Sequence, residues 1–175
     1  DDSGRDRLAR LLYGTRTAVG IGLVAVGLAA LIGTLLGALA GYRRGFVDVL
    51  VLRLIEVFLC FPSLLFLLFA SAFFGSSWLG LVLVMASLFW TSFARIVRGE
   101  LLALRERDFV LVARGLGVSE RRILWRHLMP LVKSQIGVTA AFCMASAIVA
   151  ESTLSFLGLG LGSAASSWGD TLRKG

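Results

Sequence analysis

The ionisable residues that could take part in chemistry gather in one stretch of this chain, between Arg98 and Pro130, with long apolar runs on both sides. The stretch offers no nucleophile beside a base and no cluster of metal ligands, and its single histidine, His127, is expected to pack within a helical hairpin. The sequence also lacks the Gly-x-x-x-x-Gly-Lys-[Ser/Thr] pattern that cradles nucleotide phosphates. These observations predict a protein without enzymatic activity, cofactor or metal site. The polar stretch is predicted to bind another protein.

This polar stretch is predicted to fold as two short helices joined by a turn. Asp108 can cap a first helix, and Gly117 suits the end of that helix. Ser119 can cap a second helix, which is predicted to end at Pro130. Each helix has an apolar face and a basic face, and the apolar faces carry Phe109, Val112 and Leu116 in the first helix and Ile123, Leu124, His127 and Leu128 in the second. Such a hairpin could carry a push from a bound cytoplasmic protein into the membrane spans.

The composition of the chain is that of a membrane protein. The sequence is 57% hydrophobic and 17% charged, and its mean hydropathy is +0.85. A soluble domain of 175 residues could not bury so much apolar surface in one core. A hydrocarbon core about 30 Å thick needs roughly 20 helical residues to cross it. We therefore predict an all-α, polytopic helical bundle with spans at about 17–42, 49–74, 78–97 and 134–156, and with the polar loop at about 98–130.

The distribution of basic residues predicts the orientation of these spans. Four spans leave both ends of the chain on one side of the membrane and two loops on the other. The loop side carries twelve of the 18 basic residues, namely Arg43, Arg44, Arg53, Arg95, Arg98, Arg105, Arg107, Arg114, Arg121, Arg122, Arg126 and Lys133. The loops are therefore expected in the cytoplasm and both ends of the chain outside it. Residues 1–16 are predicted to form a short amphipathic helix along the membrane surface, because their leucines recur at helical spacing.

Two features of the apolar spans predict how the helices pack. Small residues recur at every fourth position of the first span, at Ala25, Ala29, Gly33, Gly37 and Gly41. Such a stripe allows another helix to approach closely, either within the bundle or along a dimer seam. In the second span, Pro62 removes a backbone hydrogen bond and predicts a kink near Phe61 and Pro62.

Glu151 is the single ionisable residue well inside the last span. A carboxylate facing lipid costs a few kcal/mol, so Glu151 must face protein, water or a partner. Two interpretations remain open: a residue of a transport pathway or gate, or a residue of the outer interface that is hydrogen-bonded to a neighbour such as Ser152. The predicted pathway or gate residues are Glu151, Ser152, Ser155 and Phe156. The glycine-rich run that follows favours a bend or a re-entrant turn.

The hairpin resembles the cytoplasmic loop of permease subunits of binding-protein-dependent ABC importers, in particular the second permease of the dipeptide, oligopeptide and nickel branch. That loop carries Glu-Ala-Ala, three residues, Gly, about nine residues, an apolar residue, one more residue and Leu-Pro. Ala113, Gly117 and Pro130 hold this register. The chain departs from the pattern at three positions, with Leu111 in place of the glutamate, Val112 in place of the first alanine and Met129 in place of the leucine.

Further motifs of this branch occur in the same order along essentially the whole chain. They are Gly4-Arg5-Asp6, Arg10-Leu11-Leu12-Tyr13-Gly14, Gly41-Tyr42, Phe61-Pro62, Arg126-His127, Glu151 with Leu154 to Gly160, and Ser167-Trp168-Gly169. Members of the branch usually have a further helix before the first motif and another after the last. The resemblance therefore implies a fragment of a six-span subunit that lacks its first and last transmembrane helices.

The resemblance implies a fold of the type I ABC importer permease kind and a passive half-channel in a bacterial or archaeal inner membrane. Its expected partners are a homologous second permease subunit, cytoplasmic ATPases and an extracytoplasmic binding protein that delivers the substrate, for which short peptides are the favoured class. The residues that the resemblance assigns to ATPase coupling are Asp108, Ala113, Arg114, Gly117, Ser119, Arg121, Arg122, His127 and Pro130.

Two rival functions belong to other classes. An ion-coupled carrier would need intramembrane acids and broken helices in paired repeats, and Glu151 is the one acid available for that role. The hairpin also resembles a DNA-binding helix-turn-helix motif, which needs a third helix and a small core of its own. Here both flanks of the hairpin run directly into apolar spans, which favours a membrane protein that binds no nucleic acid.

Overall fold

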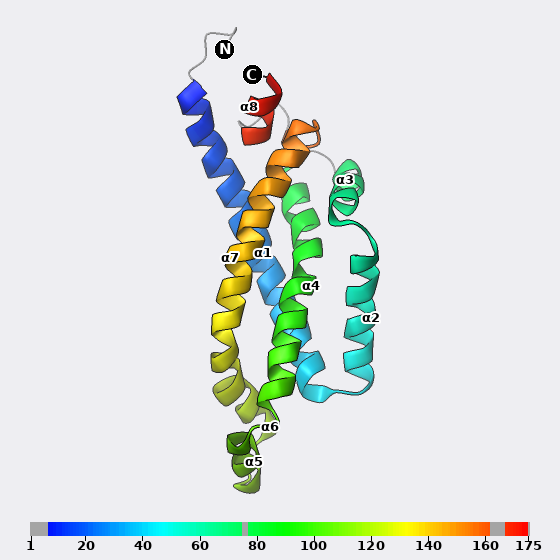
Figure 1. The fold of residues 1–175 in the computed structure, drawn as a ribbon, viewed down its shortest axis with the longest axis vertical. Coiled ribbons are helices and arrows are strands. Elements are labelled where there is room, and N and C mark those ends of the chain that lie inside the picture. Colours follow the sequence, from blue (N-terminus) through cyan, green and yellow to red (C-terminus); the bar gives the residue numbers. More distant parts are fainter. Residues whose placement is uncertain (1–6, 75–76, 162–166, 175) are drawn as a thin grey trace.

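A computed structural model describes residues 7–74, 77–161 and 167–174, and every regular element in these ranges is a helix (Figure 1). The elements are α1 (Arg7–Arg43), α2 (Phe46–Cys60), α3 (Ser63–Phe74), α4 (Trp78–Leu104), α5 (Asp108–Gly115), α6 (Glu120–Arg122), the π-helical turn η1 (Ile123–Leu128), α7 (Met129–Phe156) and α8 (Trp168–Lys174). The all-α class predicted from the sequence is thereby confirmed. The predicted motif Gly4-Arg5-Asp6 lies outside the described residues.

Three long helices, α1, α4 and α7, run along the long axis of the molecule and form its centre (Figure 1). In the described part of the chain, three helical stretches are long and apolar enough to cross a membrane, at Leu11–Arg43, Trp78–Leu104 and Glu120–Phe156. The start of α1 lies with α8 at one end of the bundle, and α5 and α6 lie at the other end. The polar hairpin is thus separated from α8 by the full length of the bundle.

The stripe of small residues in α1 faces the inside of this bundle. Ala25 and Ala29 are completely buried. A Cβ atom added to Gly33, Gly37 or Gly41 would lie 2.4, 2.5 or 2.8 Å from a backbone oxygen of α4. Contacts this short leave no room for any side chain, so the glycines allow the backbones of α1 and α4 to touch.

The second predicted span is broken into two helices. The sequence predicted a kink within one helix, whereas α2 and α3 meet at an angle of 89°. Phe61 between them is extended, with φ −92° and ψ 134°, because the ring of Pro62 disfavours the helical conformation in the preceding residue. The helix resumes when the Phe66 N–H donates to the Pro62 oxygen at 3.0 Å. Counted as one broken span, the pair raises the number of candidate spans in the described residues to four.

An ion pair ties α2 to α4 near the hairpin end. The Arg98 guanidinium donates through Nε to one oxygen of Asp48 and through Nη2 to the other, the second bond measuring 2.8 Å. The two side chains are 22% and 16% exposed. By contrast, the pair between Arg53 and Glu56 within α2, with a distance of 2.7 Å, is 74% and 57% exposed. The Asp48–Arg98 pair therefore fixes α2 relative to α4, whereas the Arg53–Glu56 pair is exposed and lies within one helix.

Several helix boundaries differ from the predicted spans. α1 begins at Arg7 and continues without a break to Arg43, so the described part of the 1–16 segment is not a separate surface helix. Its start is held against the last helix, because the Trp168 Nε1–H donates to the Leu11 oxygen at 3.1 Å. α4 continues past the predicted end near Val97 to Leu104, where Leu101 is completely buried. The polar hairpin is thus shorter than the predicted loop.

Candidate functional site

The polar hairpin consists of α5, a four-residue turn, α6 and η1, which continues into α7. Asp108 does not cap α5 but is its first residue, and Arg107 occupies the N-cap position without a side-chain hydrogen bond. Ser119 does occupy the N-cap position of α6, although its hydroxyl makes no capping bond. A carboxylate in the first turn still stabilises α5 through the helix dipole, which is how Asp108 contributes.

The turn of the hairpin depends on Gly117. This residue has φ +77°, a left-handed conformation that costs a residue with a Cβ atom roughly 1–2 kcal/mol. The Gly117 N–H donates to the Arg114 oxygen at 2.9 Å, and the Val118 N–H donates to the Ala113 oxygen at 3.0 Å. This pair of bonds is a Schellman motif, which satisfies two carbonyl groups at the end of α5. The glycine predicted to end the helix therefore sets the angle between α5 and α6.

The second helix of the hairpin does not end at Pro130, as the sequence predicted. Pro130 lies in the first turn of α7, where a missing N–H is tolerated. The preceding η1 turn has π-helical geometry, in which residues five apart share a face. Ile123 and Leu128 are accordingly both completely buried. His127, four residues after Ile123, is exposed and does not pack inside the hairpin as predicted.

A buried apolar cluster roots the hairpin in the long helices. Its members come from α1, α4, α5, η1 and α7, and they are Ala38, Val97, Leu101, Val110, Ile123, Leu124, Leu128, Met129 and Val132. Close packing of this kind transmits displacement, because interiors have few voids and low compressibility. The hairpin cannot tilt without moving the adjoining ends of α1, α4 and α7.

The outer face of the hairpin is apolar and exposed. Phe109, Val112 and Leu116, predicted to share a face of α5, are 44%, 61% and 78% exposed, while the neighbouring Val110 is completely buried. Trp125 on η1 is 47% exposed. The predicted apolar stripe of α5 therefore points away from the bundle. Exposed apolar patches of this kind mark surfaces that bind a protein or a membrane.

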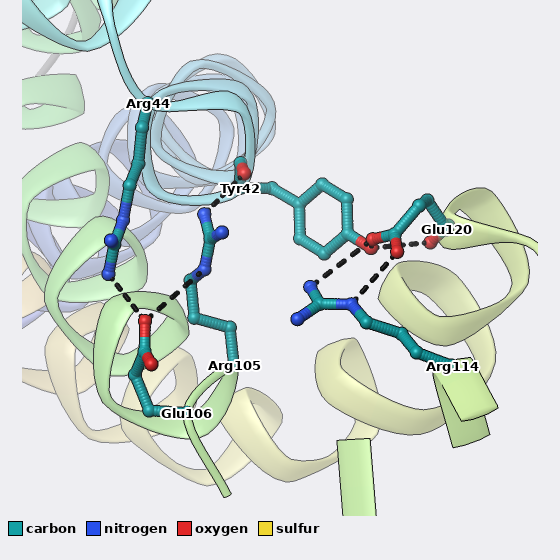
Figure 2. A network of polar contacts seen from close by, with 6 residues as sticks. All are labelled: Tyr42, Arg44, Arg105, Glu106, Arg114 and Glu120. Carbon is teal, nitrogen blue, oxygen red and sulfur yellow. Dashed lines mark hydrogen bonds and ion pairs between the residues drawn. The ribbon is translucent and has the colours of Figure 1, made fainter. Parts of the chain in front are cut away.

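A polar network joins the hairpin to the end of α1 (Figure 2). The Tyr42 hydroxyl contacts the Glu120 carboxylate and also donates to the Glu120 backbone oxygen at 3.0 Å. The Arg114 guanidinium donates to both oxygens of the same carboxylate, at 2.8 Å through Nε and 3.3 Å through Nη2. Glu120 thus bridges the two helices of the hairpin and fixes both to α1.

A second part of the network joins α1 to the loop after α4. The Arg105 Nη1 donates to the Tyr42 backbone oxygen at 2.7 Å, and its guanidinium carbon lies 5.9 Å from the centre of the Tyr42 ring. The Arg44 Nη2 donates to the Glu106 carboxylate at 2.7 Å. Burial, followed by the charges of Arg44 and Arg114, lowers the pKa of Arg105 from its ordinary value. Figure 2 shows that Tyr42 lies between the guanidinium of Arg105 and the carboxylate of Glu120.

The remaining predicted coupling residues surround this network. Arg121 and Arg122 are exposed and, with Ser119 and Trp125, line an open hollow of about 450 Å³. Ala113 is half-buried and packs against the apolar cluster below the hairpin. The structure therefore places the basic side chains on the same end of the molecule as the exposed apolar residues. Together these residues define the hairpin surface, which is the exposed face of residues 108–128.

Sequence reasoning missed five members of the polar network, Tyr42, Arg44, Arg105, Glu106 and Glu120. Tyr42 and Glu120 are 78 residues apart, so no helical period relates them. One available signal was the pair of opposite charges at Arg114 and Glu120, which flank the predicted turn. Another was an aromatic residue at the end of a span that is followed by arginines, a position typical of the membrane interface.

Glu151 and its neighbours lie at the other end of the bundle. Glu151 is completely buried, and the Ser155 hydroxyl donates to its Oε1 at 2.7 Å, while Oε2 has no hydrogen-bond partner among the described residues. The Ser152 hydroxyl donates to the Ile148 backbone oxygen at 2.9 Å. Phe156 is 49% exposed. In this structure, the buried carboxylate of Glu151 faces the packed interior of the bundle.

Residues 33–172 match the protein family described as binding-protein-dependent transport system inner membrane component. The chain is 37% identical over 175 residues to the oligopeptide transport system permease protein of Haemophilus influenzae, covering 100% of this chain and 56% of that protein. It is 36% identical over 174 residues to the glutathione transport system permease protein of Pectobacterium atrosepticum, covering 99% and 58%. It is 35% identical over 172 residues to the dipeptide transport system permease protein of Alkalihalophilus pseudofirmus, covering 98% and 57%. The chain thus spans less than two thirds of the length of these relatives.

Proposed function

Because the chain belongs to the family of binding-protein-dependent transport system inner membrane components, we propose that it is a permease subunit of an ATP-driven importer. In this proposal the chain forms half of a translocation pathway and hydrolyses no ATP itself. The observation that carries the proposal is the hairpin surface, which is exposed on its outer side and rooted by buried residues in α1, α4 and α7. Such an element can receive force from a partner and pass it into a membrane bundle.

The proposed partners follow from this role. A second, homologous permease subunit completes the pathway, cytoplasmic ATPases bind the hairpin surfaces, and an extracytoplasmic binding protein delivers the substrate. The hairpin end then faces the cytoplasm, in agreement with the excess of basic residues on the loops. The exposed apolar residues Phe109, Val112 and Leu116 provide the contact area, and Arg121 and Arg122 provide charge complementarity to an acidic rim on the ATPase.

The polar network suggests how the movement of the ATPases reaches the spans. When the ATPases close on ATP, they draw the hairpins together, and Glu120 pulls on Tyr42 at the end of α1. Arg105 carries the same displacement to the end of α4, because it donates to the Tyr42 backbone. Two spans therefore move with the hairpin, and the cavity between the subunits turns outward. Hydrolysis of ATP resets the arrangement.

Short peptides are the proposed cargo. The relatives described above are named for the transport of oligopeptides, glutathione and dipeptides, all of which contain peptide bonds. The departure from the family pattern at Leu111 bears on the ATPase and not on the cargo, because Leu111 is 53% exposed on α5. We infer that the ATPase presents an apolar surface to this position where relatives with glutamate require a polar one.

The proposal is tested by reversing the charge of the hairpin surface. Arg121→Glu combined with Arg122→Glu is expected to abolish ATP-driven peptide uptake by the reconstituted full-length complex, while the protein still inserts into the membrane. Arg16→Glu, an exposed arginine of α1 far from the hairpin, serves as the control and should leave uptake intact. Uptake by the double variant at the rate of the unmodified protein would contradict the proposed role of the hairpin surface in coupling to the ATPase. Uptake that survives without any ATPase would favour the ion-coupled carrier instead.

A further inference from the structure

A groove of about 620 Å³ opens between α4 and α7, and it is independent of the hairpin surface. Phe89 and Phe142 form part of its apolar wall. Five polar side chains also line it, and they are Ser92, Arg95, Gln135, Thr139 and Ser146. Both helices therefore contribute polar groups to one open groove along the side of the bundle. The volume lies within the range of roughly 300–1,000 Å³ that is typical of small-molecule sites.

Arg95 is the charged residue of this groove, and it has no ion-pair partner among the described residues. It lies about nine residues before the end of α4, which corresponds to about 14 Å along the helix axis. One turn further along the same helix, Arg98 is paired with Asp48. A cation that faced lipid within a span would cost a few kcal/mol, so an unpaired arginine beside these apolar walls favours a water-filled pathway or an anionic ligand.

The walls of the groove favour an anion with a planar, hydrogen-bonding head. A guanidinium binds a carboxylate through two parallel hydrogen bonds, and the neighbouring hydroxyl and amide groups can donate to the same oxygens. Among the hydroxyls, that of Thr139 already donates to the Gln135 backbone oxygen at 2.8 Å, whereas the Gln135 side-chain amide makes no hydrogen bond within the described residues. The Gln135 amide is thus available to assist Arg95.

We propose that this groove is a transit site at which Arg95 and Gln135 bind the carboxylate of the transported solute. The inference rests on the proposed function, because a peptide with a free C-terminus brings a carboxylate into the pathway. The aromatic residues Phe89 and Phe142 then contact the apolar part of the solute. The site lies in the half of the bundle nearer the hairpin, so it would hold the solute after delivery and before release.

The test compares two solutes that differ only in this group, radiolabelled trialanine and trialanine C-terminal amide. Initial rates of ATP-driven uptake are measured with the full-length protein, its ATPases and its binding protein in vesicles, and the acid-to-amide ratio of these rates is calculated. Arg95→Gln is expected to lower this ratio about tenfold, the effect of losing a charge-assisted hydrogen bond. Any preference of the binding protein for the acid or the amide is the same for every permease variant. It therefore does not affect the comparison of their ratios.

Two further variants make the result specific. Gln135→Glu keeps Arg95 but places a competing carboxylate in the groove, so it should also lower the ratio. Lys133→Gln removes an exposed cation from the same helix outside the groove and should leave the ratio unchanged. Should Arg95→Gln prevent assembly of the complex, Gln135→Glu carries the test alone.

An unchanged ratio in both groove variants would overturn the proposal. If the effect of Arg95→Gln on the ratio disappears in vesicles made of phosphatidylcholine alone, Arg95 binds anionic lipid headgroups and not the solute. That result would also overturn the proposal. Failure of the proposed function has a different signature, because the unmodified complex would then take up neither peptide in response to ATP.

Discussion

Tyr42 shows how a single side chain can join a membrane span to the hairpin surface. Its hydroxyl contacts Glu120, while its backbone oxygen accepts from Arg105. Because the hydroxyl bond is exposed to solvent, its net contribution to stability is about 1 kcal/mol or less. Its importance would therefore lie in coupling movement and not in holding the fold together.

The first prediction concerns this hydroxyl. Tyr42→Phe keeps the aromatic ring over Arg105 but removes the bonds to Glu120, so ATP-driven uptake is expected to fall several-fold with little change in the amount of inserted protein. Uptake by the reconstituted complex and protein content of the membrane are the two measurements. Tyr13→Phe, at a tyrosine that is 65% exposed near the other end of α1, is the matched control. Equal uptake by both variants would contradict a role for the network.

A second prediction concerns the buried acid. Glu151→Gln preserves the size of the side chain and the contact with Ser155 but removes the capacity for charge, so it is expected to change the transport rate or substrate range more than membrane insertion. Uptake kinetics measured beside membrane content separate the two effects. Kinetics identical to those of the unmodified protein would mean that Glu151 serves only the packing of the bundle.

At the scale of elements, the angle between α5 and α6 depends on one left-handed residue. Gly117→Val places a β-branched side chain at φ +77° and should destabilise the hairpin by about 1–3 kcal/mol. Gly115→Val is the matched control, because this glycine is helical and has open space around it. Limited proteolysis of the hairpin in purified protein is expected to be faster in the first variant only. Equal rates in the two variants would show that the turn tolerates a side chain.

The position of α2 gives a second prediction at this scale. Asp48→Asn removes half of an ion pair that is 22% and 16% exposed, and it should lower stability by about 1–3 kcal/mol, less than the 3–5 kcal/mol of a fully buried pair. Arg53→Gln, in a pair that is mostly exposed, should cost under about 1 kcal/mol. Thermal unfolding in detergent measures both, and a double-mutant cycle with Arg98→Gln isolates the pair. A coupling energy near zero would show that the Asp48–Arg98 ion pair does not stabilise the protein.

The elements also show what the sequence could and could not predict. The apolar runs predicted the long helices, and Pro62 and Gly117 predicted a kink and a turn, because their chemistry acts locally, although the kink proved to be a full break between α2 and α3. The family resemblance drawn from the motifs is confirmed. The π-helical geometry of η1 was not predictable, since Ile123, Leu124, His127 and Leu128 also fit the face of an ordinary helix. Non-local contacts such as Tyr42 with Glu120 leave no periodic signal.

At the scale of the whole molecule, the bundle separates two exposed ends. The hairpin carries Leu116, which is 78% exposed, and α8 carries Leu172, which is 72% exposed. α1, α4 and α7 run between these ends (Figure 1). If the long helices cross the membrane, the two leucines lie on opposite sides of it.

This arrangement predicts the pattern of chemical labelling. With Cys60 and Cys143 replaced by serine, a membrane-impermeant thiol reagent should reach Leu116→Cys only in inverted vesicles and Leu172→Cys only in intact cells or right-side-out vesicles. Each variant serves as the control for the other. Labelling of both variants from one side would show that the bundle does not span the bilayer in this way. Labelling of Leu116→Cys only from outside would show that the orientation is opposite to the proposed one.

The η1 turn has a consequence for how such a protein can change in evolution. A π-helical turn holds one more residue than the α-helical turn it replaces. Loss of a single codon between Ile123 and Leu128 would let this turn relax to ordinary α-helical pitch, because the wide turn already accommodates one extra residue without rotating the helices on either side of it. Insertion of a further residue would instead rotate the hairpin about the axis of α7 by about 100°, and Glu120 would face away from Tyr42. This short segment should therefore tolerate the loss of one residue far better than the gain of one.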